Sequence, residues 1–198
     1  MSPENDFIFR TLGASNHVEE ERQQEDFYAT EPKAAELLLQ VEPDLKDIWE
    51  CACGMGHLAN VFAEHDKLFL ATDIINRGYG GVYDFLTTKG SIPPLHKYHG
   101  DIVTNPPYTL AQKFIQRALD TVEEGCMVCM FLKLTFLESK ARQKFFLDNP
   151  PKTIYVSSSR IKCAKNGDFE KYPSSAIAYA WYVWEKGFTG DPIIKWIN

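Results

Sequence analysis

The most constraining feature of this sequence is an alternation of short apolar runs with longer amphipathic ones between residues 31 and 184. The short runs predict strands, and the longer runs, whose apolar residues recur every three or four positions, predict helices. Strands that alternate with helices form a mostly parallel sheet covered on both faces. We therefore expect an α/β fold, with strands near 48–51, 68–72, 102–104, 127–133, 153–156 and 176–184 and helices near 31–40, 57–65, 110–122 and 139–147.

Length and composition are typical of a single folded domain. The chain has 198 residues, 44% of them hydrophobic and 24% charged, and a chain of this length can bury roughly 70% of its surface around one core. Residues 1–25 are polar and lack periodicity. We interpret them as a flexible N-terminal arm and residues 26–198 as one domain. Residues 13–17 of the arm form either a lid over the site or an ordinary turn.

The apolar runs also bear on where the protein resides. The longest, near residues 126–132, is well short of the roughly 18 residues that span a bilayer, and the N-terminus has no apolar signal core. Five cysteines, an odd number, favour reduced thiols over a disulfide framework. We expect a cytoplasmic protein with no membrane span.

A glycine-containing turn follows the first predicted strand. Residues 50–57 read Glu-Cys-Ala-Cys-Gly-Met-Gly-His, so that Glu50 closes the strand and Gly54 and Gly56 precede a helix. In open α/β sheets, nucleotides bind in this first crevice. The next strand ends at Asp73, where a carboxylate can accept from both ribose hydroxyls. Asp84 follows in the right order to accept from an adenine amino group.

The decisive motif is Asp-Ile-Val-Thr-Asn-Pro-Pro-Tyr at residues 101–108. Pro106 and Pro107 end the strand, because proline lacks a backbone N–H. The side-chain oxygen of Asn105 and the carbonyl of Pro106 can both accept from one exocyclic NH2 group, while Tyr108 can stack on a planar ring. The motif predicts a site that positions an amine.

Together these motifs resemble the S-adenosylmethionine-dependent amino-methyltransferases with an Asn-Pro-Pro-Tyr motif, and more narrowly the short phage and prophage DNA adenine-N6 methyltransferase-like proteins. The resemblance extends from about residue 12 to residue 186 and includes residues 26–32 and 133–139. It implies a Rossmann-like class I methyltransferase fold, with a mostly parallel sheet of seven strands and helices on both faces.

The resemblance also implies residue roles. The target amine is held by Asn105, Pro106, Pro107 and Tyr108. In the cofactor site, Glu50 and the two glycines contact the methionine end, Asp73 the ribose and Asp84 the adenine. An additional cofactor motif near the N-terminus matches the gamma-type motif order, although Glu31 stands where these proteins often have proline. The residues assigned to S-adenosylmethionine are Phe27, Tyr28, Thr30, Pro32, Glu50, Gly54, Gly56, Asp73, Asp84 and Asn105.

Charge is unevenly distributed along the chain. The net charge is −6, yet residues 133–165 hold eight basic residues against Glu138 and Asp148, which is 8 − 2 = +6. Lys and Arg neutralise phosphates in nucleic-acid binding, so this basic segment is a candidate footprint. Lys133, Arg160 and Lys162, near strand ends, are the predicted contacts. The alternative is a solvated helix face. The loop at residues 157–173 is a candidate cover for the substrate.

The cysteines allow one further interpretation. Cys51-x-Cys53 and Cys126-x-x-Cys129 have the spacing of a four-thiolate zinc site. Side chains alternate between the faces of a strand, however, which favours buried thiols that pack as small apolar groups. We expect no metal.

These observations predict methyl transfer from S-adenosylmethionine to N6 of adenine in DNA. RNA adenine and a protein glutamine amide are alternative substrates, because an Asn-Pro-Pro-Tyr site accepts any planar NH2 group. A non-catalytic adenosyl-ligand or nucleic-acid binding module is an alternative of a different class. The recognition sequence, the strand preference and the oligomeric state stay open.

Overall fold

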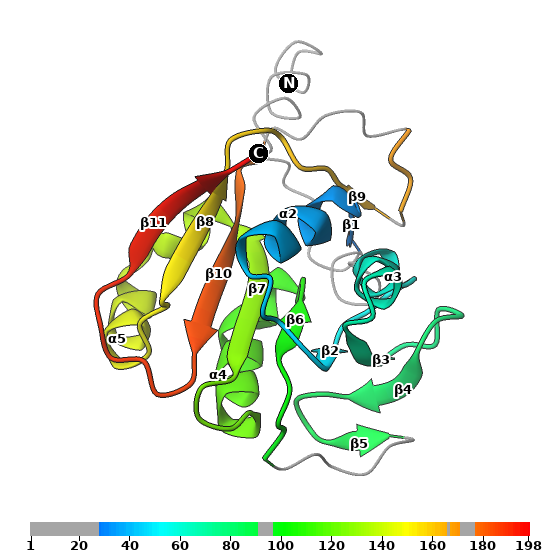
Figure 1. Cartoon of the computed structure of the whole chain (residues 1–198), viewed down its shortest axis with the longest axis horizontal. Coiled ribbons are helices and arrows are strands. Elements are labelled where there is room, and N and C mark those ends of the chain that lie inside the picture. The colour runs from blue at the N-terminus through cyan, green and yellow to red at the C-terminus, as the bar shows by residue number, and fades with distance from the viewer. Residues whose placement is uncertain (1–27, 91–96, 166, 171–176) are drawn as a thin grey trace, which may run out of the picture.

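The computed structural model describes residues 28–90, 97–165, 167–170 and 177–198, and its main feature is a nine-stranded sheet (Figure 1). The strand order is β11-β8-β10-β7-β6-β2-β3-β4-β5. In that order the strands are Ile193–Ile197, Thr153–Ser157, Tyr179–Glu185, Met127–Lys133, Ile102–Thr104, Ile48–Glu50, Leu68–Asp73, Gly81–Asp84 and Lys89–Gly90. The predicted arm at residues 1–25 lies outside the described residues.

Most neighbouring strands in this sheet are parallel. β4, β3, β2, β6 and β7 pair in parallel, as do β8 and β11. β10 is antiparallel to both β7 and β8, and β5 is antiparallel to β4. The predicted α/β fold with a mostly parallel sheet is confirmed. The sheet has nine strands rather than seven, because β5 and β11 extend its two edges.

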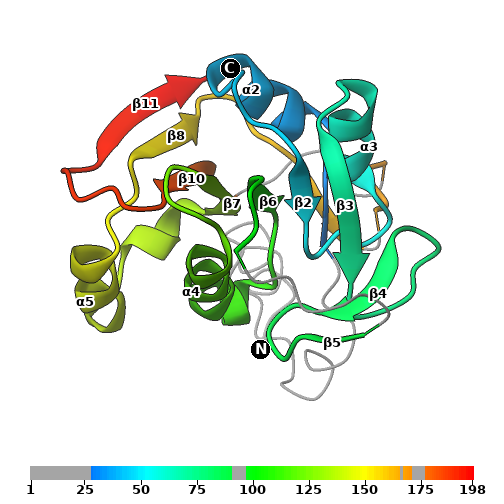
Figure 2. The same ribbon diagram turned by 60° about the horizontal axis from the view of Figure 1, so that its bottom comes forward.

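Helices cover both faces of the sheet, as predicted. Figure 2 shows α2 (Lys33–Val41) and α3 (His57–Glu64) on one face, and α4 (Ala111–Thr121) and α5 (Lys140–Asp148) on the other. Each face has its own core. Along β7, Met130 and its alternate neighbours pack with α4, whereas Cys129 and Phe131 pack with α2 and α3. No helix in the described part of the chain has the length and apolar character needed to cross a bilayer.

Five short strands were not predicted. Besides β4, β5 and β11, these are β1 (Tyr28–Thr30) and β9 (Cys163–Lys165), which pair with each other as a separate two-stranded antiparallel sheet. Strands this short show too few residues to establish a period of two. In β11, Trp196 is 70% exposed, so the sequence lacks the alternation of buried and exposed residues that would predict a strand there. The predicted strand at 176–184 begins at Tyr179, and residue 176 lies outside the described residues.

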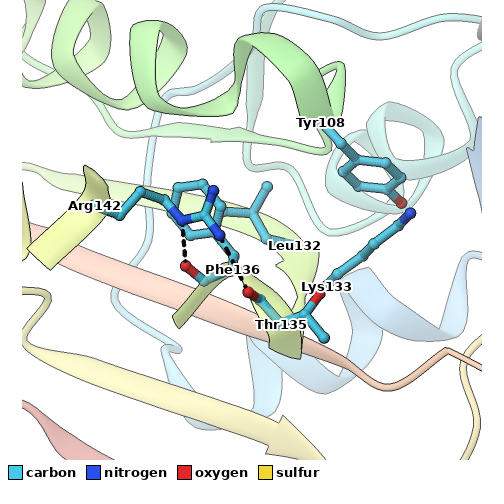
Figure 3. Close-up of a pocket in the computed structure, with 6 residues that line it drawn as sticks. All are labelled: Tyr108, Leu132, Lys133, Thr135, Phe136 and Arg142. Atoms are coloured by element: carbon cyan, nitrogen blue, oxygen red, sulfur yellow. Dashed lines mark hydrogen bonds between the residues drawn. The ribbon is translucent and has the colours of Figure 1, made fainter. Parts of the chain in front are cut away.

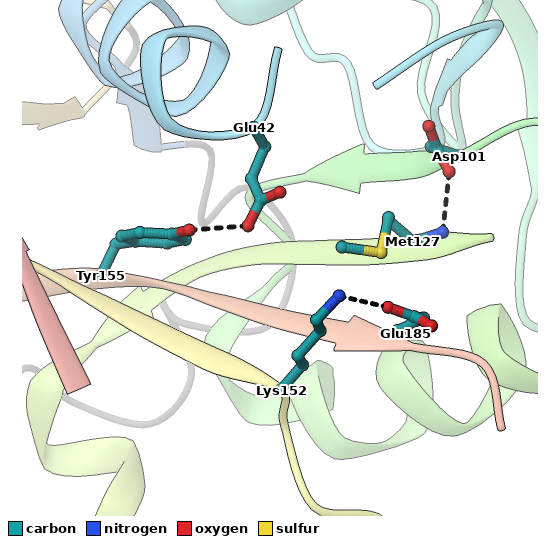
Figure 4. Close-up of polar contacts among 6 residues, drawn as sticks. All are labelled: Glu42, Asp101, Met127, Lys152, Tyr155 and Glu185. Carbon is teal, nitrogen blue, oxygen red and sulfur yellow. Dashed lines mark hydrogen bonds and ion pairs between the residues drawn. The ribbon is translucent and has the colours of Figure 1, made fainter. Parts of the chain in front are cut away.

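Polar contacts fix the amino end of the parallel strands (Figure 4). The carboxylate of Asp101, just before β6, accepts backbone N–H groups from Met127 at 2.7 Å and Lys46 at 2.8 Å. Lys152, just before β8, forms an ion pair with Glu185 at the end of β10. The Tyr155 hydroxyl donates to the Glu42 carboxylate at 2.7 Å, which joins β8 to the end of α2. These contacts lie at the amino end of the parallel strands, opposite the carboxyl end where the site is predicted.

Candidate cofactor and amine site

The predicted glycine turn lies between β2 and α3. Gly54 and Gly56 have φ angles of 55° and 84°, in the left-handed region that favours glycine. A Cβ atom on Gly56 would lie 2.5–2.6 Å from ring atoms of Tyr79, so a larger residue would displace that ring. Both positions therefore require glycine for local reasons, in addition to any role in binding.

Glu50 ends β2 beside this turn. It is 2% exposed, and its Oε2 atom has no hydrogen-bond partner among the described residues. Burial raises the pKa of Glu50 to about 8; a hydrogen bond from the Ala59 backbone opposes the rise, and the nearby Asp73 carboxylate adds to it. A buried oxygen without a partner is suited to accept from an amino group of a ligand.

Asp73, at the end of β3, is tied to the glycine turn. One carboxylate oxygen accepts the backbone N–H of Gly54 at 2.9 Å, and the other accepts the N–H of Ile75 at 2.9 Å. The structure thus brings together the acidic strand end and the glycine turn, as the motif order predicted. A carboxylate has about four acceptor positions, so two N–H bonds leave capacity for ribose hydroxyls.

Asp84 ends β4 and is engaged in its own turn. Its carboxylate accepts the backbone N–H groups of Leu86 at 3.0 Å and Thr87 at 3.1 Å, and the Thr87 hydroxyl at 2.5 Å. Burial opposes ionisation, but the bonds from Thr87 and Leu86 outweigh it and hold the pKa of Asp84 below its ordinary value. The assignment of Asp84 to the adenine stays a prediction.

Asn105 follows β6, and its side chain is oriented by the N-terminal strand β1. The Nδ2 group donates to the Thr30 hydroxyl at 2.7 Å and to the Tyr28 carbonyl at 3.3 Å. The Oδ1 atom is buried and has no hydrogen-bond partner among the described residues. Because two acceptors hold the NH2 end, the amide presents its oxygen as the free acceptor.

Tyr108 is linked to this amide indirectly, through Cys163 of β9 and Thr30. Its hydroxyl donates to Cys163 Sγ at 3.8 Å, and the same sulfur lies 3.9 Å from the Thr30 hydroxyl. Burial raises the pKa of Tyr108 well above its ordinary value, so the phenol stays neutral. Thr30 and Cys163 therefore join the two polar side chains of the Asn-Pro-Pro-Tyr motif.

The prolines of the two motifs have structural roles. Pro106 is buried, and Pro107 is exposed before the 3-10 helix Tyr108–Leu110. Pro32 precedes α2, where its carbonyl accepts the N–H of Ala35 at 2.9 Å. Phe27, assigned to the cofactor, lies outside the described residues.

The three predicted phosphate contacts lie in different settings. The Lys133 ammonium lies 4.7 Å from the centre of the Tyr108 ring, beside the amine site. Arg160 is exposed in the loop before β9. The Lys162 backbone N–H donates to the Glu31 carboxylate at 2.9 Å, and the Glu31 backbone N–H donates to the Lys162 carbonyl at 3.0 Å. Glu31, the departure from the family pattern, thus holds β1 against the segment that leads into β9.

Sequence reasoning missed several residues near the site. Tyr79 packs on Gly56, and no local pattern indicates it. Cys163 has no partner spacing, yet it contacts Tyr108 and Thr30. In the loop proposed as a cover, the Phe169 ring meets His57 at the start of α3, with ring centres 5.5 Å apart. The described part of that loop therefore contacts the glycine-turn side; residues 166 and 171–173 lie outside the described residues.

The zinc alternative is not supported by the positions of the cysteines. Cys51 lies in the core on the α4 face of the sheet, and Cys129 lies in the core on the opposite face. Among the residues that the structure describes, no three His, Cys, Asp or Glu side chains are grouped to hold a metal ion. The cysteines pack as buried or half-buried thiols.

Comparison with solved structures identifies the fold. No family model matches the sequence, and no curated protein is detectably similar to it. A candidate RNA methyltransferase from Pyrococcus horikoshii superposes with a TM-score of 0.56 at 12% identity, over 94% of this chain and 100% of that one. The type IIG restriction endonuclease BpuSI gives a TM-score of 0.60 at 13% identity, over 94% of this chain and 28% of that one.

A third similar structure is the M protein of the type I restriction enzyme EcoKI. It has a TM-score of 0.53 at 14% identity, over 96% of this chain and 49% of that one. This chain therefore spans about half of the M protein and a smaller part of BpuSI. At such identities the likeness concerns the fold, which is that of the class I S-adenosylmethionine-dependent methyltransferases.

Proposed function

We propose that the protein transfers a methyl group from S-adenosylmethionine to N6 of adenine in DNA. The observation that carries the proposal is the side chain of Asn105, whose buried oxygen has no partner in the described part of the chain while its NH2 end is held by Thr30 and Tyr28. A fixed, unpaired acceptor beside an aromatic ring fits an exocyclic amine on a planar base. The fold, shared with enzymes that include restriction-modification proteins, supports this assignment.

The residues around the glycine turn fit S-adenosylmethionine. The unpaired oxygen of Glu50 suits the amino group of the methionine part, and Asp73, already fixed by the turn, suits the ribose. Asp84 is assigned to the adenine, and Phe27, Tyr28, Thr30 and Pro32 supply the N-terminal side. When bound, this cofactor supplies an electrophilic methyl group on a sulfonium.

The chain's own contribution is to prepare the amine. The lone pair of an aryl amine is delocalised into the ring, which makes the nitrogen a weak nucleophile. Hydrogen bonds to Asn105 Oδ1 and to the Pro106 carbonyl orient both N–H bonds and draw the nitrogen toward a pyramidal geometry. Tyr108 stays neutral. It stacks on the target adenine and acts by positioning that ring, not by accepting a proton.

A methylation assay with product identification tests this proposal. The protein is incubated with methyl-labelled S-adenosylmethionine and, separately, with duplex DNA, single-stranded DNA, RNA and protein, and the modified residue is identified by mass spectrometry. We expect N6-methyladenine in DNA. If the methylated product is RNA adenine or a protein glutamine, that molecule replaces DNA as the proposed substrate. If no amine is methylated, the result favours a non-catalytic binding module.

Asn105→Ala tests the mechanism. Loss of one positioned electrostatic partner typically lowers a rate by about 10² to 10³, so single-turnover methyl transfer should fall by that factor. Cofactor affinity, measured by calorimetry on the same variant, separates the loss of the amine acceptor from the loss of the cofactor contact that is also assigned to Asn105. Asn60→Ala, exposed on α3, is the matched control. An Asn105→Ala protein that methylates at the wild-type rate would contradict the mechanism.

A further inference from the structure

A hollow adjoins the proposed amine site at Tyr108. It is a pocket of about 150 Å³ lined by Tyr108, Leu132, Lys133, Thr135, Phe136 and Arg142 (Figure 3). It shares Tyr108 with the amine site but includes neither Asn105 nor any other residue assigned to the cofactor. Its lining contains two cationic side chains and no carboxylate. We call it the Lys133–Arg142 pocket.

Arg142 is fixed in the wall of this pocket. Its guanidinium donates to the carbonyls of Phe136 at 2.8 Å, Thr135 at 3.3 Å and Glu138, and it lies 4.8 Å from the centre of the Phe136 ring. These bonds hold it against the 3-10 helix Leu134–Leu137 (Figure 3). Carbonyls orient the guanidinium without neutralising its charge.

Lys133 places a second charge at the opposite side of the pocket. Its ammonium lies 4.7 Å from the centre of the Tyr108 ring, at the end of β7. Neither Lys133 nor Arg142 forms an ion pair with any carboxylate in the described part of the chain. Two cations around one hollow, with no counter-charge among the residues that the structure describes, favour an anionic ligand.

We propose that the Lys133–Arg142 pocket binds a backbone phosphate that flanks the target nucleotide. The inference rests on the proposed function, because a base stacked on Tyr108 places the adjoining backbone next to this pocket. Phosphate contacts position a nucleic acid without reading its sequence, and both Arg and Lys bind phosphate. A glutamine side chain has no such group, so the pocket selects a polynucleotide as the substrate class.

The test measures binding rather than methylation. Fluorescent oligonucleotides with one adenine, single-stranded and duplex, carry a neutral methylphosphonate at each flanking linkage in turn, and affinity is measured by anisotropy over a range of salt. A methylphosphonate at one of these linkages should weaken binding by the wild-type protein about tenfold. Lys133→Met should weaken binding of the unmodified oligonucleotide by a similar factor. It should also lower the slope of log affinity against log salt concentration by about 0.7 to 0.9.

The two changes should not add. In Lys133→Met, the methylphosphonate at the sensitive linkage should have a smaller effect than in wild type, because the Lys133 contact is already lost and only the Arg142 contact remains. Lys133→Arg should restore binding. Lys144→Met is the control, because Lys144 lies exposed on α5 and pairs with Asp148. Arg142→Lys, which keeps the charge but not the fork geometry, should give an intermediate loss.

The outcomes separate this inference from the proposed function. Wild-type affinity in Lys133→Met and in Arg142→Lys, or no sensitive linkage, would overturn the pocket assignment while N6-adenine methylation would still stand. Binding that depends on Lys133 and on one linkage, by a protein that methylates no nucleic acid, would support the pocket and overturn the proposed function. A wild type that binds none of the oligonucleotides would overturn the pocket.

Discussion

The two ends of the sheet differ in how their polar groups are satisfied. At the amino end of the parallel strands, Asp101 accepts two backbone N–H groups and Lys152 pairs with Glu185 (Figure 4). At the carboxyl end, three buried side-chain oxygens have no partner among the described residues, namely Glu50 Oε2, Thr104 Oγ1 and Asn105 Oδ1. Both ends are built from the same strands, so strand formation itself does not explain the difference.

A buried polar group without a partner destabilises a fold by about 1–3 kcal/mol. At the amino end, the Asp101 carboxylate and the Lys152 ammonium are satisfied by contacts inside the chain, whereas the carboxyl end keeps acceptors available. Departures from full satisfaction are expected where a protein binds its ligands. We therefore expect stability to depend on the amino end of the sheet and ligand binding on the carboxyl end, and this division can be tested at both ends.

The largest expected effect concerns Glu50. Its pKa is raised from 4.5 to about 8 in the folded chain, so the native state keeps a proton that the unfolded state has released. Stability should therefore fall by several kcal/mol as the pH rises from about 4.5 to 8. Glu50→Gln should remove that part of the slope and should be more stable than wild type at pH 8, as measured by urea unfolding. Equal slopes would contradict the assignment; Glu185→Gln, at the amino end, is the control.

Asp73→Ala tests the proposed cofactor site at the carboxyl end of the sheet. Loss of the carboxylate that we propose receives the ribose should weaken S-adenosylmethionine binding by about 1.5–3 kcal/mol. Titration calorimetry measures this, with Asp44→Ala, exposed in the loop after α2, as the control. Unchanged affinity would show that the cofactor lies elsewhere.

Asp101→Asn tests the amino end. The amide keeps one acceptor and buries an NH2 group where the second N–H bond was accepted, so the free energy of unfolding should fall by about 1–3 kcal/mol. Affinity for S-adenosylmethionine in the folded protein should not change. A loss of affinity as large as that of Asp73→Ala would break the division between the two ends.

Thr30→Val gives the smallest expected effect. It removes one of two acceptors that orient the Asn105 amide, and a single hydrogen bond contributes about 1 kcal/mol, so the methylation rate should fall about tenfold or less. Thr30→Ser keeps the hydroxyl and should behave as wild type. Equal rates for Thr30→Val and Thr30→Ser in single-turnover assays would mean that the Tyr28 carbonyl alone orients the amide.

The parts of the molecule that follow local rules were predictable. The strand at residues 127–133 and the strand at 102–104 have the predicted bounds, because long or buried apolar runs leave a clear pattern. Asp73 and Gly54 meet because parallel strands end at the same edge of the sheet. Motif order was therefore sufficient to bring Asp73 and the glycine turn together; their role in binding the cofactor stays a prediction.

The contacts that complete the amine side depend on distant pairing, which no local pattern indicates. Thr30 and Cys163 are register partners of β1 and β9, 133 positions apart. The sequence left open whether the basic segment is a solvated helix face, and the position of Arg142 became clear only from its bonds to the 3-10 helix beside it. Side-chain orientation at a helix start is set by such tertiary contacts rather than by spacing.

The pairing of β1 with β9 also has a consequence for biosynthesis. Asn105 leaves the ribosome well before Cys163–Lys165, the strand against which β1 pairs. Until that strand is made, β1 has no partner, and the acceptors that orient the Asn105 amide are not yet held in place. The glycine turn and Asp73 are thus both synthesised before residue 105, whereas the strand that fixes the acceptors of the Asn105 amide is synthesised only after residue 162.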